Sequence, residues 1–108
     1  MAENLFDLTG QAALVTGASR GLGQYFGRAL ARAGADLVIT SRDASRLAAF
    51  QEEIAALGRR TAAVALDLRD RDSIRRAAAE AWSAFGQIDI LVNNAGCNVR
   101  KPALEVTW

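Results

Sequence analysis

Residues 15–23 read VTGASRGLG, and this stretch decides the fold that the sequence predicts. An apolar run over 12–15 comes before it and is typical of a buried strand. A strand, a glycine-rich turn and a helix in this order form a cradle for phosphate. The glycines let the backbone approach a pyrophosphate, and the N–H groups at the helix start face it with the positive end of the helix dipole. The helix is indicated by apolar residues that recur at helical spacing, namely Leu22, Phe26, Ala29, Leu30 and Ala33.

The spacing of the glycines limits which kind of phosphate-binding loop the sequence predicts. Gly17, Gly21 and Gly23 give Gly-x-x-x-Gly-x-Gly, which differs from the commoner Gly-x-Gly-x-x-Gly. A P-loop is excluded because it ends in Gly-Lys-Ser/Thr, whereas Gln24 follows Gly23 here. Taken alone, the three glycines could also serve only the turn and the packing of the helix.

Strand and helix patterns alternate along the chain, which predicts a parallel sheet covered by helices. Strands are expected over 12–16, 36–41, 61–66 and 88–93. Helices are expected over 21–33, from an N-cap at Asp43 to Gly58, and from an N-cap at Asp70 or Asp72 to Gly86. The inward faces of the second and third helices are expected to carry Leu47, Phe50, Ile54 and Leu57, and Ile74, Ala78, Ala81 and Phe85, respectively.

Right-handed crossovers then give the strand order 3-2-1-4, the first half of a Rossmann-like, doubly wound α/β sheet, truncated after the fourth strand. We expect one partial dinucleotide-binding domain over 1–108. The first two helices should cover one face of the sheet and the third helix the other. Ligands bind such sheets where the winding reverses, between the first and fourth strands. Both glycine-bearing loops, 17–23 and 93–96, fall at this point.

Composition excludes several classes of function. The chain has 108 residues with 13 basic and 12 acidic side chains, and no basic stripe that would indicate a nucleic-acid partner. With one cysteine and no histidine, neither an internal disulfide nor a Cys/His metal site is expected. No signal peptide or stretch of roughly 20 apolar residues is visible, so no membrane contact is expected. The cytoplasm is the simplest compartment.

Three motifs together resemble the short-chain dehydrogenase/reductase family. They are Thr16-Gly17-x-x-x-Gly21-x-Gly23, Asp67 after the third strand, and Asn93-Asn94-Ala95-Gly96 after the fourth strand. The resemblance covers essentially the whole chain. It implies an oxidoreductase that interconverts a small-molecule alcohol and carbonyl with a nicotinamide cofactor, and a homodimer or homotetramer when the protein is full length.

The resemblance also implies roles for individual residues. Asp67 would accept a hydrogen bond from the adenine amino group, although without the motif it would be an ordinary turn or cap acid. Asn94, Ala95 and Gly96 would line the central ribose. The complete set of expected cofactor-binding residues is Gly17, Ser19, Arg20, Gly21, Leu22, Gly23, Ser41, Arg42, Asp67, Leu68, Asn94, Ala95 and Gly96.

The end of the second strand favours NADP(H) over NAD(H). An NAD enzyme needs an acid there for the ribose hydroxyls. Here Ser41 and Arg42 stand at this position, and a hydroxyl and a guanidinium fit a 2′-phosphate that a carboxylate would repel. Arg20 adds a second positive charge. The alternative is that Arg42 simply faces water beside the Asp43 cap.

No catalytic residue is expected within this chain. The family uses a tyrosine whose pKa is lowered by a lysine four residues later, together with a serine, all after the fourth strand. Tyr25 is the only tyrosine, with Ala29 in place of the lysine, and Lys101 lies in a loop. Cys97 has no histidine to activate it. We therefore expect further chain after Trp108, and an inactive fragment without it.

Three alternatives remain at this point. The first is an NADP-dependent dehydrogenase whose loop 98–102 looks like that of gluconate-type sugar-acid dehydrogenases, with a 3-oxoacyl carrier-protein reductase as the runner-up. The second is a dinucleotide-binding half-domain without catalysis. A methyltransferase on a similar sheet would leave the Asn-Asn-Ala-Gly motif unexplained.

Overall fold

The computed structural model describes residues 7–95. Within this range the strands are β1 (Ala12–Val15), β2 (Asp36–Ser41), β3 (Thr61–Ala65) and β4 (Ile90–Val92). The helices are α1 (Gly21–Arg32), α2 (Ala48–Ala56) and α3 (Arg71–Phe85), and a short 3₁₀ helix, η1 (Ala44–Leu47), precedes α2.

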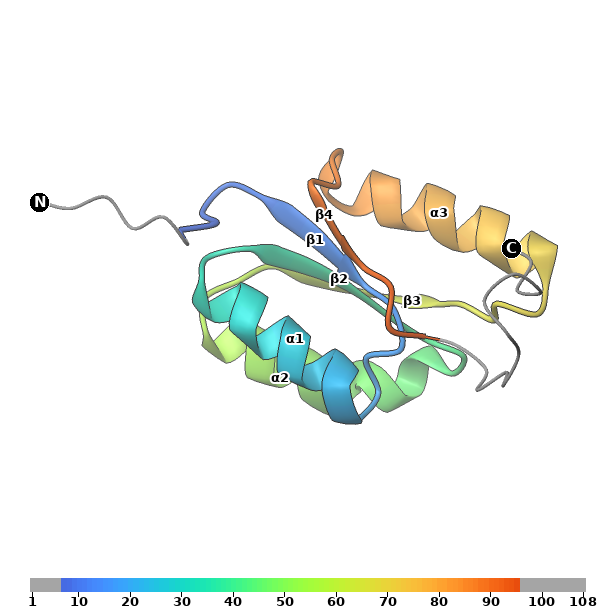
Figure 1. Cartoon of the computed structure of the whole chain (residues 1–108), viewed down its shortest axis with the longest axis horizontal. Coiled ribbons are helices and arrows are strands. Elements are labelled where there is room, and N and C mark those ends of the chain that lie inside the picture. Colours follow the sequence, from blue (N-terminus) through green and yellow to red (C-terminus); the bar gives the residue numbers. More distant parts are fainter. Residues whose placement is uncertain (1–6, 96–108) are drawn as a thin grey trace, which may run out of the picture.

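The strands form one parallel sheet in the order β3-β2-β1-β4. Helices α1 and α2 lie against one face and α3 against the other (Figure 1). The order, the parallel pairing and the distribution of helices are those expected from the sequence. The change of face occurs between β1 and β4, which pair directly from Ala13–Ile90 to Val15–Val92.

The two central strands are apolar because both of their faces are covered. Leu37, Val38 and Ile39 of β2 are completely buried. Successive side chains point to opposite faces, so Leu37 and Ile39 join the core under α1 and α2, while Val38 joins the smaller core under α3. Residues 37–39 of β2 therefore contribute side chains to the cores on both faces of the sheet.

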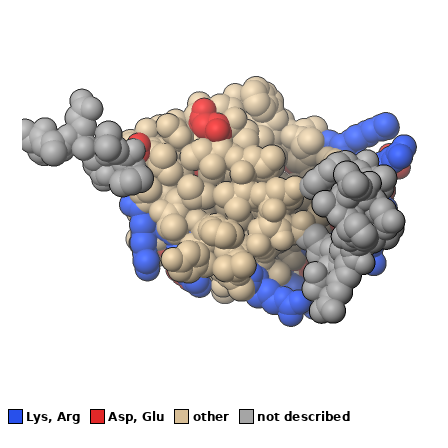
Figure 2. Space-filling view, in the orientation of Figure 1, with Lys and Arg blue, Asp and Glu red and all other residues tan. Residues whose placement is uncertain are grey.

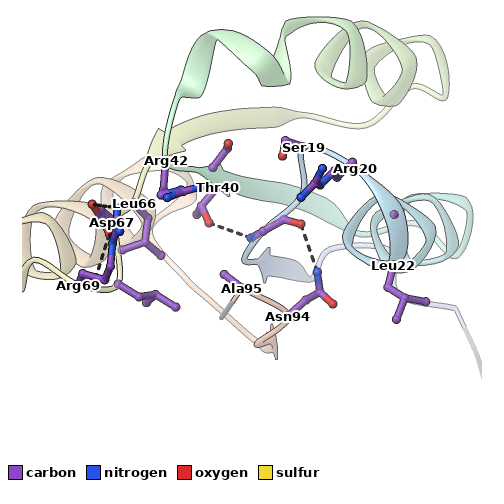
Figure 3. A pocket seen from close by; sticks show the side chains of 14 residues that line it. Ser19, Arg20, Leu22, Thr40, Arg42, Leu66, Asp67, Arg69, Asn94 and Ala95 are labelled. Atoms are coloured by element: carbon purple, nitrogen blue, oxygen red, sulfur yellow. Dashed lines mark hydrogen bonds and ion pairs between the residues drawn. The ribbon is translucent and has the colours of Figure 1, made fainter. Parts of the chain in front are cut away.

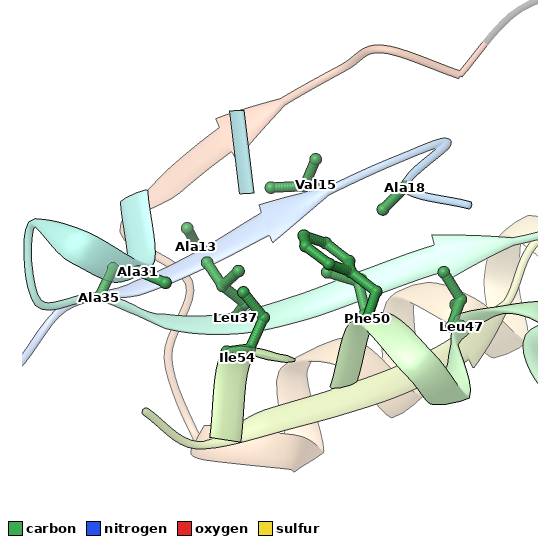
Figure 4. Packing of buried hydrophobic residues seen from close by; sticks show 10 residues of the cluster. Ala13, Val15, Ala18, Ala31, Ala35, Leu37, Leu47, Phe50 and Ile54 are labelled. Carbon is green, nitrogen blue, oxygen red and sulfur yellow. The ribbon is translucent and has the colours of Figure 1, made fainter. Parts of the chain in front are cut away.

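Helix α1 meets the sheet mainly through its smallest residues. The buried positions are Gly23, Gly27 and Ala31, whereas Leu22 is 63% exposed. A Cβ at Gly27 would lie 2.8 Å from Cζ of Phe50 on α2, so the ring of Phe50 fills the space that the missing side chain leaves (Figure 4 shows Phe50 among the core residues). Close approach of the backbone, which apolar periodicity does not detect, sets the rotation of this helix.

The face of α3 is only partly the expected one: Ala81 and Phe85 pack against the core as expected, but Ile74 and Ala78 do not. Ala77 and Ala81 are buried, while Ile74 is 38% exposed and Ala78 is exposed. Phe85 is half-buried and lies under the guanidinium of Arg60, whose Cζ is 4.7 Å from the ring centroid. Small residues again make the contact with the sheet, because they allow the helix axis to come close.

Several boundaries differ from the sequence prediction. Strands β1, β3 and β4 are shorter than expected, and the second helix begins as η1 before it continues as α2. Leu57, expected on the inward face, follows the end of α2 and is 40% exposed. Trp82 of α3 is 57% exposed. The N-caps Asp43 and Asp70 are as expected, because each accepts a hydrogen bond from the backbone N–H two residues later.

Polar contacts fix the strand ends away from the predicted ligand edge. The carboxylate of Asp89 accepts the N–H of Ala12 at 2.8 Å and so joins the start of β4 to β1. Asp36 pairs with Arg60 at 2.8 Å across the starts of β2 and β3. Between the helices, Arg28 of α1 pairs with Glu53 of α2.

Charged side chains lie mainly around the rim of the face seen in Figure 2, whose centre is formed by uncharged residues. Among residues 7–95, no helix combines the length and apolar character needed to cross a bilayer. The exposed large apolar side chains of this part of the chain include Leu22, Tyr25, Trp82 and Leu91.

Candidate functional site: a crevice at the carboxyl ends of β1, β2 and β4

The turn after β1 is built around two glycines that no other residue could replace without movement of the backbone. Gly17 has a φ of +66°, and a Cβ there would lie 2.9 Å from Cα of Ala95 in the segment after β4. A Cβ at Gly23 would lie only 2.2 Å from the carbonyl oxygen of Gly17. The turn therefore lies directly against the first turn of α1 and against the end of β4.

The hydroxyl of Thr16 joins this turn to the segment after β4. Its oxygen accepts the N–H groups of Asn94 and Ala95, both at 2.9 Å, and it donates to Oδ1 of Asn93 at 3.1 Å. One hydroxyl thus uses its single proton and both acceptor positions. Because Thr16 is buried, this bonding holds the two loops in a fixed relation.

The same turn is held from its other side by β2 and Asn94. The N–H of Gly17 donates to Oγ1 of Thr40 at 3.3 Å, and the N–H of Ala18 donates to the Thr40 carbonyl at 2.8 Å. The side-chain amide of Asn94 donates to the Gly17 carbonyl at 3.2 Å (Figure 3). The N–H groups of Gly17 and Ala18 and the carbonyl of Gly17 therefore all bond to neighbouring parts of the protein.

These loops enclose a crevice with a volume of about 630 Å³ at the carboxyl edge of the sheet. This is the position at which open, doubly wound sheets bind ligands. Its lining includes most of the residues singled out in the sequence: Gly17, Ser19, Arg20, Gly21, Leu22, Ser41, Arg42, Asp67, Leu68, Asn94 and Ala95.

Two of the expected residues are not part of this lining. Gly23 lies behind the turn, where its missing side chain makes room for the Gly17 carbonyl. Gly96 lies outside the described residues, as do Cys97 and Lys101. Tyr25, which the sequence analysis rejected as a catalytic residue, is 66% exposed on α1 and does not line the crevice.

The N-terminus of α1 faces this crevice without a cap of its own. Arg20, the N-cap residue, has extended backbone angles and makes no side-chain cap hydrogen bond, and the first turn contains no acid. The first N–H groups of an α-helix have no partner within the helix, and the helix dipole adds a partial positive charge at this end. An anion is the natural partner for such an end.

A second hollow of about 410 Å³ adjoins the crevice and is lined by four arginines and two aspartates. The two share Ser19, Arg20, Ser41, Arg42, Asp67 and Arg69, and the second extends to Asp43 and Arg46. Hydrogen bonds from Ser45 hold the pKa of Asp43 below its ordinary value, so this carboxylate is ionised and occupied by its own loop. The combined surface is cationic.

Asp67 is ionised at neutral pH. Hydrogen bonds from the side chain and the backbone N–H of Arg69 lower its pKa, and the charges of Arg69 and Arg42 act in the same direction. Its carboxylate can therefore only accept hydrogen bonds, as an adenine amino group would require. No cluster of three or more metal-ligating side chains occurs within residues 7–95.

Sequence reasoning did not assign Thr40, Leu66 and Arg69 to the crevice, although all three line it. Thr40 carries a detectable signal, because it is a polar residue in the otherwise apolar run of β2. No sequence pattern marks Arg69, since its position in the lining depends on the course of the β3–α3 loop toward Arg42. Thr16 was recognised as part of a motif, but its role in joining two loops needed the structure.

Comparison with known proteins identifies the family. Residues 11–108 match the short chain dehydrogenase family. The chain belongs to this family. A curated relative, gluconate 5-dehydrogenase of Gluconobacter oxydans, is 41% identical over 102 residues, which make up 94% of this chain and 40% of that protein.

Solved structures agree on the fold and differ in the cofactor they contain. A metagenomic short-chain oxidoreductase in complex with NADP is 45% identical with a TM-score of 0.78, covering 84% of this chain and 41% of that one. A 7α-hydroxysteroid dehydrogenase in complex with NADH and a bile-acid derivative is 34% identical with a TM-score of 0.82, covering 94% and 41%. The chain thus spans about 40% of the length of such oxidoreductases.

Proposed function

We propose that this chain forms the cofactor-binding part of an NADP(H)-dependent oxidoreductase that interconverts an alcohol and a carbonyl. The observation that carries the cofactor choice is the end of β2. Ser41 and Arg42 stand there, no acid is present at that position, and Arg20 lies across the same hollow. A 2′-phosphate would find a hydroxyl and two guanidinium groups, whereas the ribose hydroxyls of NAD(H) would lack the carboxylate that usually binds them.

The crevice suggests how the cofactor would lie. Its pyrophosphate would meet the uncapped start of α1 and the turn from Gly17 to Leu22. Its adenine would lie beside Asp67 and Leu68, and its central ribose beside Asn94 and Ala95, which Thr16 holds in place. Gly96 would extend the last of these contacts. The presence of Asp67, Leu68, Asn94 and Ala95 in the lining of the crevice supports these assignments.

The residues of this chain would bind and orient the cofactor, which supplies the hydride when bound. Acid–base catalysis would come from the part of the relatives that lies beyond the matched region, where the family places its tyrosine, lysine and serine. We extend the proposal to a sugar acid as substrate, which the similarity to gluconate 5-dehydrogenase supports. A 3-oxoacyl carrier-protein is the second choice. The complete protein would be a homo-oligomer.

The coding sequence beyond Trp108, read together with the intact mass of the protein, separates the enzyme from the second candidate. A serine and Tyr-x-x-x-Lys after position 108 support the oxidoreductase. A chain that ends at Trp108 and still binds the dinucleotide supports a non-catalytic binding module, which the share of about 40% of the relatives' length makes worth testing.

Cofactor preference is tested by the dissociation constants of NADPH and NADH for the protein made from its complete coding sequence. We expect NADPH to bind about tenfold more tightly or better, because charge-assisted contacts to the phosphate are about twice as strong as neutral ones. Ser41→Asp should reverse the order, since it places an acid at the end of β2. Arg32→Ala, on the last turn of α1 and outside both hollows, is the matched control. Equal or tighter binding of NADH by the unaltered protein would contradict the proposal.

A further inference from the structure

Asp67 lies between two arginines at the adenine end of the crevice (Figure 3). The backbone N–H and Nε of Arg69 donate to Oδ1 of Asp67 at 3.0 and 3.2 Å, and Nη2 donates to Oδ2 at 3.4 Å. The positive charge of Arg42, on the neighbouring loop, also reaches this carboxylate and lowers its pKa. All three side chains line both hollows.

This arrangement places a negative charge where it would disturb the binding of a phosphate. The carboxylate of Asp67 carries the same sign as a 2′-phosphate and competes with it for the guanidinium of Arg42. The family resemblance assigns Asp67 to adenine, and the chemistry at the end of β2 assigns Arg42 to the phosphate, but neither gives a reason why the two do not simply pair with each other. Arg69 supplies the reason, because it takes up the charge of Asp67.

The ion pair of Asp67 and Arg69 should itself add little to the stability of the fold. Both side chains are substantially exposed, at 35% and 63%, and exposed pairs of this kind add little to stability. The loop is held by other bonds: the N–H of Asp67 donates to Oγ of Ser73 at 2.9 Å, and the N–H of Asp70 donates to the Asp67 carbonyl at 3.1 Å. Removal of the Arg69 side chain should therefore change the charge of the hollow and leave the backbone of the β3–α3 loop in place.

We propose that Arg69 is a positioning residue for cofactor specificity: it neutralises Asp67 and thereby leaves Arg42 available to the 2′-phosphate of NADP(H). The inference rests on the proposed function and deepens it, because it names a determinant outside the family motifs. Arg69 acts through Asp67 and Arg42, so its effect should fall on NADPH more than on NADH. The two cofactors share every other group.

The test is the ratio of NADH to NADPH dissociation constants in four proteins made from the complete coding sequence. These are the unaltered protein, Arg69→Ala, Asp67→Asn and the double variant. Arg69→Ala should lower the ratio about three- to tenfold, the size expected of one partly screened charge near the site. In the Asp67→Asn background the same change should have almost no effect on the ratio, since no carboxylate remains to be neutralised. Arg75→Ala, on α3 and outside both hollows, controls for net charge.

The outcomes of this test separate failure of the present inference from failure of the proposed NADP(H) preference. A high ratio in the unaltered protein that Arg69→Ala leaves unchanged overturns this inference alone. An equal fall in both backgrounds also overturns it, because Arg69 would then contact the phosphate directly. A ratio near one in the unaltered protein overturns the proposed NADP(H) preference and this inference together. Arg69→Lys, which keeps the charge, should retain most of the ratio, and its failure to do so would contradict neutralisation.

Discussion

Helices α1 and α3 both begin at the carboxyl edge of the sheet, yet they differ in N-cap residue, in side-chain cap and in the charge of the first turn. The start of α3 is capped by Asp70, whose Oδ1 accepts the N–H of Asp72 at 2.9 Å, and Asp72 places an acid in its first turn. The start of α1 has no side-chain cap and no acid, and an arginine stands in the N-cap position.

One helix start is thus capped by a side chain of its own, while the other leaves its first N–H groups without a side-chain cap. A cap at α1 would stabilise the chain by about 1 kcal/mol, yet the sequence does not provide one. The uncapped start lies on the crevice, and the capped one lies outside its lining. Of these two helix starts, the one without a side-chain cap is therefore the one at the candidate site.

The largest effect is expected from substitution of the third residue of α1, compared with the third residue of α3. Gly23→Ala should lower the free energy of unfolding by about 3 kcal/mol and abolish dinucleotide binding, because the new Cβ would lie 2.2 Å from a backbone oxygen of the turn. The matched Ser73→Ala in α3 should cost only about 1 kcal/mol, since it removes one hydrogen bond, and should weaken binding far less than Gly23→Ala, because only the N–H of Asp67 loses a partner. Chemical unfolding and NADPH titration measure both, and similar losses of binding in the two variants would remove the contrast.

A smaller and opposite pair of effects is expected at the cap positions. Asp70→Ala should lower the free energy of unfolding by about 1 kcal/mol, because α3 loses its cap. Arg20→Asp should raise it by about 0.5 kcal/mol or more, since it gives α1 a cap and an acid, while it weakens NADPH binding.

Arg20→Ala separates the two contributions of the α1 variant. It removes the cation without adding a cap, so binding should weaken while stability stays nearly constant. Thermal unfolding with and without NADPH measures both quantities. If Arg20→Asp destabilised the free protein, the start of α1 would not be an unfilled cap site.

The smallest effect concerns the dependence of the free energy of unfolding on pH. Hydrogen bonds from Arg69 hold the pKa of Asp67 below its ordinary value of about 3.9, so the folded state releases this proton more readily than the unfolded one. The stability from this pair is complete above that value and is lost as the pH falls below it. Between pH 5 and pH 3, Arg69→Ala should therefore lose less stability than the unaltered protein, as followed by thermal unfolding. If stability fell in parallel with pH in the two proteins, the Asp67–Arg69 pair would contribute nothing to stability.

The order of elements and their strand order could be predicted because they follow from local patterns and one chirality rule. The apolar run 37–39 has to lie between two layers, and right-handed crossovers then leave one layout for four parallel strands. The glycines at 17, 21 and 23 predicted the crevice because few other arrangements place them between a strand and a helix.

The faces of the helices could be predicted in this way only in part. Apolar spacing correctly placed Phe50 and Ile54 of α2 and Ala81 of α3 inward. It also placed Ile74 of α3 inward where Ala77 is buried instead, and it does not mark the buried Gly27 of α1. The distance between a helix and the sheet depends on what the neighbouring helix contributes, as Phe50 does opposite Gly27. No local pattern contains that information.

The sequence by itself determined the family, the α/β layout and most of the crevice lining, because each of these depends on residue types at short, fixed spacings. Only the tertiary structure decided which charges meet at the site. The pairing of Asp67 with Arg69 within reach of Arg42, and the bonds of Thr16 to Asn94 and Ala95, join loops from different strands. Their proximity arises because parallel strands bring their carboxyl ends to one edge of the sheet.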